Sequence, residues 1–272
     1  MELIERIENI ELNDNNKYYL DETMEEYQNY LNKINNFDPK LLKYFLETLR
    51  EMELINNHET EYESTMLLML HKNSHRENSI KRIIKLYSEK EKLDKEDLKL
   101  LHKILMQGTQ NDLSTYDFRK TDNEFVGAFN SDGSKRIDYM PVDSSEIEND
   151  IDKVLDYLCD NNIDDPFTKS FIAHGIIAVM QPFYDGNTRL SRLLQYAEIW
   201  KNTNMLYGTN FQSPTIFLSK NYLMTRGQYR NLITNLAVNK DNEAWNKWIT
   251  YNLNMVNEQL YYLNNNIQRM KN

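Results

Sequence analysis

The stretch Gln181-Pro-Phe-Tyr-Asp-Gly-Asn-Thr-Arg-Leu-Ser-Arg192 decides the fold, because it separates the two most apolar segments of the chain. Residues 171–180 read Phe-Ile-Ala-His-Gly-Ile-Ile-Ala-Val-Met, apolar on every side, which predicts a buried central helix. Pro182 ends this helix, and a second helix is expected to begin near Thr188. Its apolar face is formed by Leu190, Leu193, Leu194 and Ala197. A loop and a helix start are therefore predicted in the core of the protein.

This stretch carries the residue types that bind phosphate. The first N–H groups of a helix lack acceptors and carry positive partial charge, so they attract anions. Gly186 and Asn187 tolerate the tight backbone geometry that lets several N–H groups converge on one anion. Arg189 and Arg192 lie three apart on one helix face, and Asp185 can offer a carboxylate to Mg²⁺. These residues indicate a site for a nucleoside di- or triphosphate.

An ordinary turn explains the same residues without a ligand. In that interpretation the segment 185–187 is a surface turn, and the two arginines pair with some of the 42 acidic residues. The apolar flanks weigh against it, because a buried arginine needs an anionic partner. From these residues alone, the two interpretations stand about even.

The composition predicts a mainly all-α protein, since 272 residues include only 7 Gly and 5 Pro. A net charge of −10 argues against nucleic acid as a partner. No apolar run reaches the roughly 18 residues of a membrane span, and the N-terminus does not resemble a signal peptide, so we expect a cytoplasmic protein. Cys159 stands alone, and the five histidines lack metal-ligand spacing, so no structural zinc site is expected.

Residues 109–143 differ from the rest because their helical periodicity is lost. Asp132-Gly133 lies between apolar-containing runs and predicts a β-hairpin. On either side of this region, Asp94 is expected to cap one helix, and Ser145-Glu-Ile-Glu148 is predicted to be a capping box for the next.

The central stretch resembles the signature of the Fic family, His-x-Phe-x-(Asp/Glu)-Gly-Asn-Gly-Arg-x-x-Arg. Two positions differ: Gln181 stands in place of the histidine, and Thr188 in place of the second glycine. The six matching positions are Phe183, Asp185, Gly186, Asn187, Arg189 and Arg192. Further segments similar to the family are 116–127, 139–141, 216–219, 226–229 and 245–248. Together they cover about residues 60–256.

The resemblance implies a Fic-like helical domain with a small β-hairpin flap. We expect this domain over residues 61–256, with a core at about 95–205. Residues 1–60 are then an N-terminal helical extension and 257–272 the end of the C-terminal helix. Because no linker composition separates these parts, one compact unit is predicted.

The resemblance also implies that the loop binds ATP with Mg²⁺ and that AMP is transferred to a hydroxyl of a target protein. By the same resemblance, Asp185 holds the metal and Gly186, Asn187 and Thr188 line the phosphate site. Arg189 grips the outer phosphates, and Arg192 closes on the γ-phosphate. Tyr229 borders the base pocket, and the flap at 125–141 pairs with an extended target segment by adding a strand.

Gln181 is the departure that matters most for catalysis. A glutamine cannot accept the hydroxyl proton near neutral pH, and losing a general base typically costs about 10²–10⁴ in rate. Two functions therefore stay open: a transferase with weakened or altered chemistry, and an inactive nucleotide-sensing or partner-binding module. The inhibitory glutamate of many relatives aligns with either Leu68 or Glu77 here. The nucleotide base, the target and any homo-oligomer are not settled by the sequence.

Overall fold

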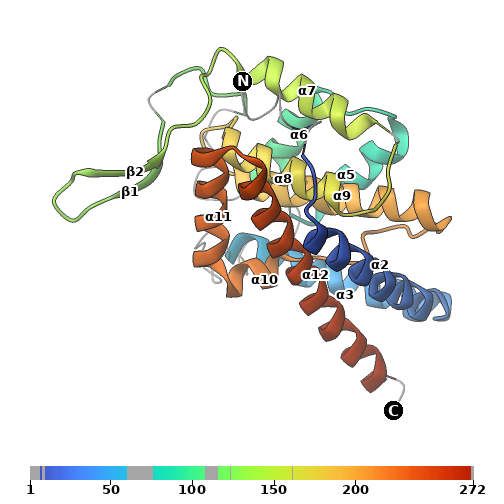
Figure 1. The fold of residues 1–272 in the computed structure, drawn as a ribbon. Coiled ribbons are helices and arrows are strands. Elements are labelled where there is room, and N and C mark those ends of the chain that lie inside the picture. Colours follow the sequence, from blue (N-terminus) through green and yellow to red (C-terminus); the bar gives the residue numbers. More distant parts are fainter. Residues whose placement is uncertain are drawn as a thin grey trace.

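The computed structural model describes residues 7, 10–59, 76–107, 116–122, 124–160 and 162–270. It is 69% helical with a single two-stranded antiparallel sheet among the described residues, which confirms the predicted all-α fold with a hairpin flap (Figure 1). The helices are α2 (Asp14–Asn35), α3 (Pro39–Glu59), α5 (Arg76–Glu89), α6 (Lys95–Met106), α7 (Ile147–Cys159), α8 (Thr168–Met180), α9 (Asn187–Tyr207), α10 (Ser219–Met224), α11 (Arg226–Asn239) and α12 (Asn242–Met270). The strands are β1 (Val126–Phe129) and β2 (Lys135–Tyr139).

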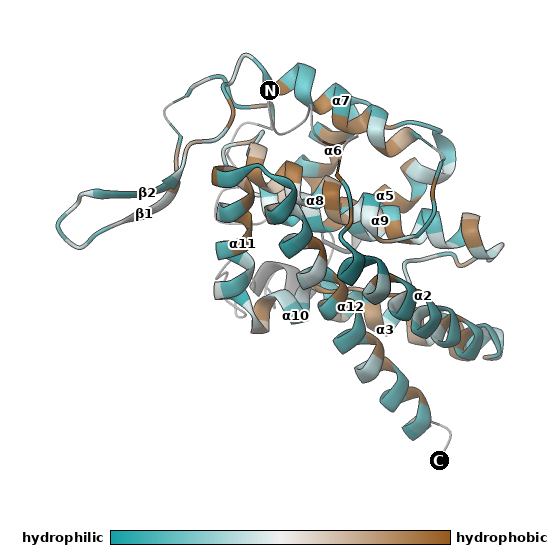
Figure 2. Ribbon diagram, in the orientation of Figure 1, coloured by the Kyte–Doolittle hydropathy of each residue, from teal (hydrophilic) through white to brown (hydrophobic). Residues whose placement is uncertain are grey.

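The core is built around α8, as its continuous apolar sequence predicts. Every residue from Lys169 to Met180 is buried, because α7, α9, α11 and α12 all pack against this helix. Figure 2 shows the hydrophobic colour concentrated on α8 and on the inner faces of its neighbours. Gly175 permits the close approach of α11 and α12, since a Cβ there would lie 3.0 Å from Leu236 Cδ1 and from Trp245.

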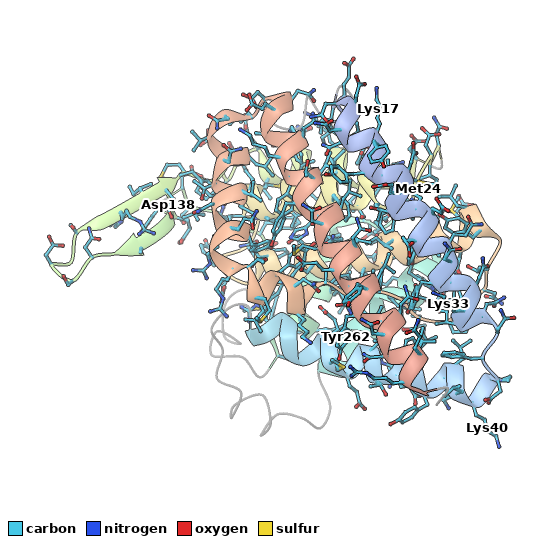
Figure 3. All side chains as sticks on the ribbon, turned by 60° about the horizontal axis from the view of Figure 1, so that its bottom comes forward. Lys17, Met24, Lys33, Lys40, Asp138 and Tyr262 are labelled. Atoms are coloured by element: carbon cyan, nitrogen blue, oxygen red, sulfur yellow. The ribbon has the colours of Figure 1, made fainter. Side chains whose placement is uncertain are left out.

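Helices α2 and α12 run side by side, held by asparagine side chains as well as by apolar contacts (Figure 3). Asn16 Nδ2 donates to Asn246 O at 2.9 Å and to its Oδ1 at 2.8 Å. Farther along, Asn257 Nδ2 donates to Thr23 Oγ1 at 2.9 Å. This polar seam joins the N-terminal helix to the C-terminal one along their shared direction.

The hairpin has the turn that the Asp132-Gly133 pair predicts. Gly133 adopts φ 81°, and the turn is closed by Gly133 N donating to Asn130 O at 3.0 Å. The two strands project from the helical body beside α11 (Figure 1), and at their base the Tyr139 hydroxyl donates to Ala178 O at 3.1 Å. We call residues 125–141 the flap.

The helix starts agree with the sequence in one case and differ in another. Asp94 caps α6 in a full capping box with Asp97, as predicted for the cap. The capping box predicted at Ser145 is wrong: α7 begins at Ile147 behind Glu146, whose side chain makes no capping bond. A backbone turn precedes the helix instead, with Glu146 N donating to Asp143 O at 3.0 Å.

No helix in the described ranges is long and apolar enough to cross a bilayer.

Candidate functional site

The junction of α8 and α9 is a tight loop, residues 181–187, which we call the motif loop. Gln181 ends α8 in the left-handed conformation (φ 51°, ψ 60°), and its N–H donates to Ile177 O at 3.2 Å. Gly186 is also left-handed at φ 77°, and a Cβ there would lie only 2.5 Å from Met106 Sδ. Both the dihedral angle and the contact require glycine at position 186.

Asn187, the first residue of α9, holds the motif loop closed. Its Oδ1 accepts from Phe183 N at 2.8 Å, and its Nδ2 donates to Phe183 O at 2.8 Å. The same Nδ2 donates to Gln181 Oε1 at 2.9 Å. Because the side chain is buried, these bonds lie in a region of low dielectric, where they are strong. Asn187 therefore positions the loop in addition to bordering the cavity described below.

The Gln181 side chain is bonded at both ends of its amide. Oε1 accepts from Asn187, and Nε2 donates to Ala178 O at 2.5 Å. Next to it, burial raises the pKa of the Tyr139 hydroxyl far above its usual value, although a hydrogen bond with Gln181 opposes this shift. Neither side chain can take up a proton from a hydroxyl near neutral pH.

Asp185 and Arg189 form an ion pair one turn apart, with Arg189 Nη2 at 3.1 Å from Asp185 Oδ2. Asp185 Oδ1 also accepts from Gly186 N at 2.6 Å. The Arg189 side chain is only 3% exposed, whereas that of Asp185 is 38% exposed. The carboxylate is therefore reachable from solvent, and the guanidinium lies behind it.

His102 on α6 contacts the motif loop, and sequence reasoning gave it no role. Its ring stacks on Phe183 with centroids 3.8 Å apart and planes 3° apart, and its Nε2 lies 2.8 Å from Asp185 O. Burial, together with the nearby Arg189 charge, lowers the pKa of His102 to about 4. The neutral ring must carry its proton on Nε2 to donate to this carbonyl. The only indication in the sequence that His102 is buried near the site was its position among the apolar residues of α6.

Arg119 joins the motif loop to both ends of the flap. Its backbone N donates to Pro182 O at 2.9 Å, and its Nε donates to Gln181 O at 2.8 Å. Its Nη1 reaches Thr121 O at 3.3 Å on one side of the flap, and its Nη2 donates to Val142 O on the other. The sequence placed Arg119 in a family-like segment but assigned it no contact.

Arg192 is fully buried, so its predicted role at the γ-phosphate requires a change that exposes it. Its Nη1 lies 3.4 Å from the Tyr229 hydroxyl, which is also 2.8 Å from His174 Nε2. Glu53 on α3 lies within its electrostatic reach: burial raises the pKa of Glu53 to about 7, and bonds from Ser219 and the Arg192 charge oppose that rise.

The two alternatives for the inhibitory position cannot be compared. Leu68 lies outside the described residues, and only the backbone of Glu77, in α5, is described.

A cavity of about 770 Å³ brings the motif loop, the flap and α11 together. Of the predicted site residues it is lined by Gln181, Asp185, Gly186, Asn187, Thr188 and Tyr229, while Arg189 and Arg192 do not line it. The flap contributes Arg136 and Asp138, and Figure 3 shows Asp138 at the flap base beside α11. A larger cleft, of about 940 Å³, lies at the opposite end of α8 and contains none of the predicted site residues.

No cluster of three or more His, Cys, Asp or Glu suited to a metal occurs in the described part of the chain. Mg²⁺ commonly takes only one or two protein carboxylates and completes its shell with phosphate and water oxygens. The carboxylate of Asp185, which borders the cavity and is 38% exposed, fits this pattern.

Comparison with known proteins agrees with this geometry: residues 92–198, from just before α6 to within α9, match the model of the Fic/DOC family. The matched residues include the flap, α8 and the whole motif loop. No match was found among curated proteins.

Solved Fic structures share the fold over most of the chain. A Fic family protein from Desulfovibrio desulfuricans G20 is 17% identical, with a TM-score of 0.64 over 93% of this chain and 74% of that one. Fic-1 (residues 134–508) from C. elegans is 15% identical, with a TM-score of 0.63 over 94% and 73%. A Fic-domain signaling protein from Bacteroides thetaiotaomicron VPI-5482 is 14% identical, with a TM-score of 0.63 over 89% and 95%. At these identities the likeness concerns the fold.

Proposed function

We propose that the protein binds ATP with Mg²⁺ in the 770 Å³ cavity and transfers AMP slowly to a hydroxyl of a protein target. The observation that carries this proposal is the motif loop itself. Its backbone is held by buried side chains, while Asp185, Gly186 and Thr188 border the cavity at the start of α9. Four residues of the predicted phosphate site, Asp185, Gly186, Asn187 and Thr188, thus border the cavity, and Gln181 stands in place of the base.

The start of α9 suits the phosphate groups. Gly186 and Asn187 border the cavity at the start of a 21-residue helix, and the first N–H groups of a helix have no intrahelical acceptors. Such groups bind anions through hydrogen bonds and through the helix dipole. Arg189 places a buried guanidinium beside the loop, where it is paired with the Asp185 carboxylate.

Asp185 would hold the Mg²⁺ ion, which when bound neutralises phosphate charge and favours departure of pyrophosphate. Its carboxylate is oriented from two sides, by Gly186 N–H and by the Arg189 guanidinium. Coordination would weaken the ion pair with Arg189 and leave that guanidinium available to a phosphate oxygen.

In the transfer step, the oxygen of the target hydroxyl attacks the α-phosphorus of ATP. The bond from that phosphorus to the bridging oxygen breaks, and pyrophosphate leaves with the electron pair. The hydroxyl proton goes to water in the open cavity, because neither end of the Gln181 amide can accept it. A loss of about 10²–10⁴ in rate follows from the missing base, while positioning and charge stabilisation remain.

The flap would hold the target segment. A two-stranded sheet leaves an unpaired edge on each strand, and an extended peptide can add to such an edge by main-chain hydrogen bonds. The Tyr139 hydroxyl at the flap base donates to Ala178 O on α8, 39 residues later in the chain. This bond anchors the flap next to Gln181. A peptide on the flap is therefore held at the mouth of the cavity.

A second function is favoured by the Gln181 contacts: a nucleotide-sensing or partner-binding module without transfer. Both amide ends of Gln181 are used within the protein, which leaves this side chain structural. In this case nucleotide binding is the output, and the flap engages a partner when the site is filled.

Calorimetry with ATP and Mg²⁺ tests nucleotide binding, which both functions require. We expect binding by the wild type and a loss of at least tenfold in Arg189→Gln, because a charge-assisted contact is worth about 1.5–3 kcal/mol. Incubation with α-labelled ATP and lysate separates them, since only the transferase labels protein. Absence of ATP binding contradicts both functions.

A further inference from the structure

We propose that His102 is a positioning residue that orients the Asp185–Gly186 peptide for metal and phosphate binding; this inference rests on the proposed function. It lies outside the motif stretch, 83 residues before the carbonyl that it contacts. The one side chain makes two kinds of contact with the motif loop, which can be separated by substitution.

The first contact is a stack. The His102 ring lies parallel to Phe183, 3.8 Å from it, and both side chains are buried. Phe183 is itself fixed in the loop, because its backbone N and O both bond to the Asn187 amide. The stack therefore anchors the middle of the motif loop to α6, and any planar apolar ring could provide it.

The second contact is directional. His102 Nε2 donates to Asp185 O over 2.8 Å. The Asp185 carbonyl and the Gly186 N–H belong to one rigid peptide plane, so holding the carbonyl fixes the direction of that N–H. In the structure this N–H meets Asp185 Oδ1 at 2.6 Å, which in turn orients the carboxylate toward the cavity. The His102 bond thus orients the Gly186 N–H, and this N–H orients the carboxylate of Asp185, the proposed metal ligand.

Helix α6 also packs closely against Gly186. A Cβ at this position would lie 2.5 Å from Met106 Sδ and 3.2 Å from His102 Nε2, so α6 presses directly on the peptide that His102 holds. With φ at 77°, Gly186 is a residue whose conformation is easily changed unless its neighbours restrain it. His102 provides a restraint that combines packing and hydrogen bonding.

A side chain that only stacked on Phe183 would not need the ring nitrogens of His102. His102 is fully buried, and its Nδ1 has no hydrogen-bond partner in the described part of the chain. A buried acceptor without a partner costs free energy, and phenylalanine would avoid that cost while keeping the stack. What the histidine adds is the donor to Asp185 O.

Two substitutions separate the contacts. His102→Phe keeps the ring and removes the donor, whereas His102→Gln keeps an N–H near the Nε2 position and removes the ring. We expect His102→Phe to melt close to the wild type and to bind ATP with Mg²⁺ about fivefold more weakly, the value of one hydrogen bond. We expect His102→Gln to melt at a lower temperature and to retain affinity close to that of the wild type.

Equal affinities of His102→Phe and the wild type for ATP with Mg²⁺ would overturn the inference. The amide resonances of Gly186 and Asn187 give a reading that needs no ligand: we expect them to shift in His102→Phe and to return toward wild-type positions in His102→Gln. Unchanged resonances in His102→Phe also overturn the inference. If the wild type binds no ATP while these resonances respond as expected, the proposed function fails and the positioning role stands.

Discussion

The motif loop and the flap border the same cavity, yet they are held in very different ways. The motif loop is fixed from within by Asn187 and from outside by His102 and Arg119, all of them buried. The flap is a two-stranded sheet that stands away from the body and is anchored at its base by Tyr139. The difference separates a preorganised binding surface from an adaptable docking surface.

The largest expected effect on stability comes from a substitution in the motif loop, the more rigid of the two regions. Asn187→Ala removes two buried hydrogen bonds and one that is partly buried, so we expect the free energy of unfolding to fall by about 3 kcal/mol. Asn130→Ala in the flap turn is the matched control, because its bond to Ser134 is exposed. We expect that control to change stability by less than about 0.5 kcal/mol in urea denaturation. Similar losses in the two variants would contradict the comparison.

The stability of the protein should depend on pH through Glu53, a buried carboxyl group within electrostatic reach of Arg192. Its pKa is raised from 4.5 to about 7, so the folded protein holds this proton across a range where the unfolded chain has released it. The wild type therefore loses stability as pH rises from about 4.5 through 7, and Glu53→Gln does not. At 1.36 kcal/mol per pKa unit, the stability of the variant relative to wild type should grow by about 2 kcal/mol between pH 5 and 8. A constant difference in melting temperature would contradict this burial of Glu53.

The smallest effect is expected at the flap anchor. Tyr139→Phe removes the bond to Ala178 O and should cost about 1 kcal/mol. Since this bond ties the flap to α8, backbone amides of β1 and β2 should exchange with deuterium faster, while those of α9 keep their rates. Equal acceleration in α9 would mean that flap and motif loop are one cooperative unit.

Much of the fold could be predicted because its signals are local in the sequence. The apolar run at 171–180 identifies α8, and Asp132-Gly133 identifies the hairpin turn. The capping box at Ser145 failed because a turn through Asp143 claims the same backbone. The α2–α12 seam was missed because asparagines carry it, and they read as surface residues in a sequence.

The site was predictable in its residue types and not in its contacts. Asp185 and Gly186 border the cavity, as expected of residues beside a helix start. Arg192 does not line the cavity, because it is fully buried and its guanidinium lies against the Tyr229 hydroxyl of α11. His102 and Arg119 touch the motif loop from 83 and 62 residues away, and no spacing rule connects such distant positions.

Gln181→His tests the central claim most directly, namely that the binding half of the site is intact and only the base is missing. The measurement is transfer of label from α-labelled ATP to protein, compared between the wild type and the variant at equal ATP occupancy. We predict a gain of about 10²–10⁴ in the rate of transfer with little change in ATP affinity. No gain in a variant that binds ATP as well as the wild type does would contradict the account.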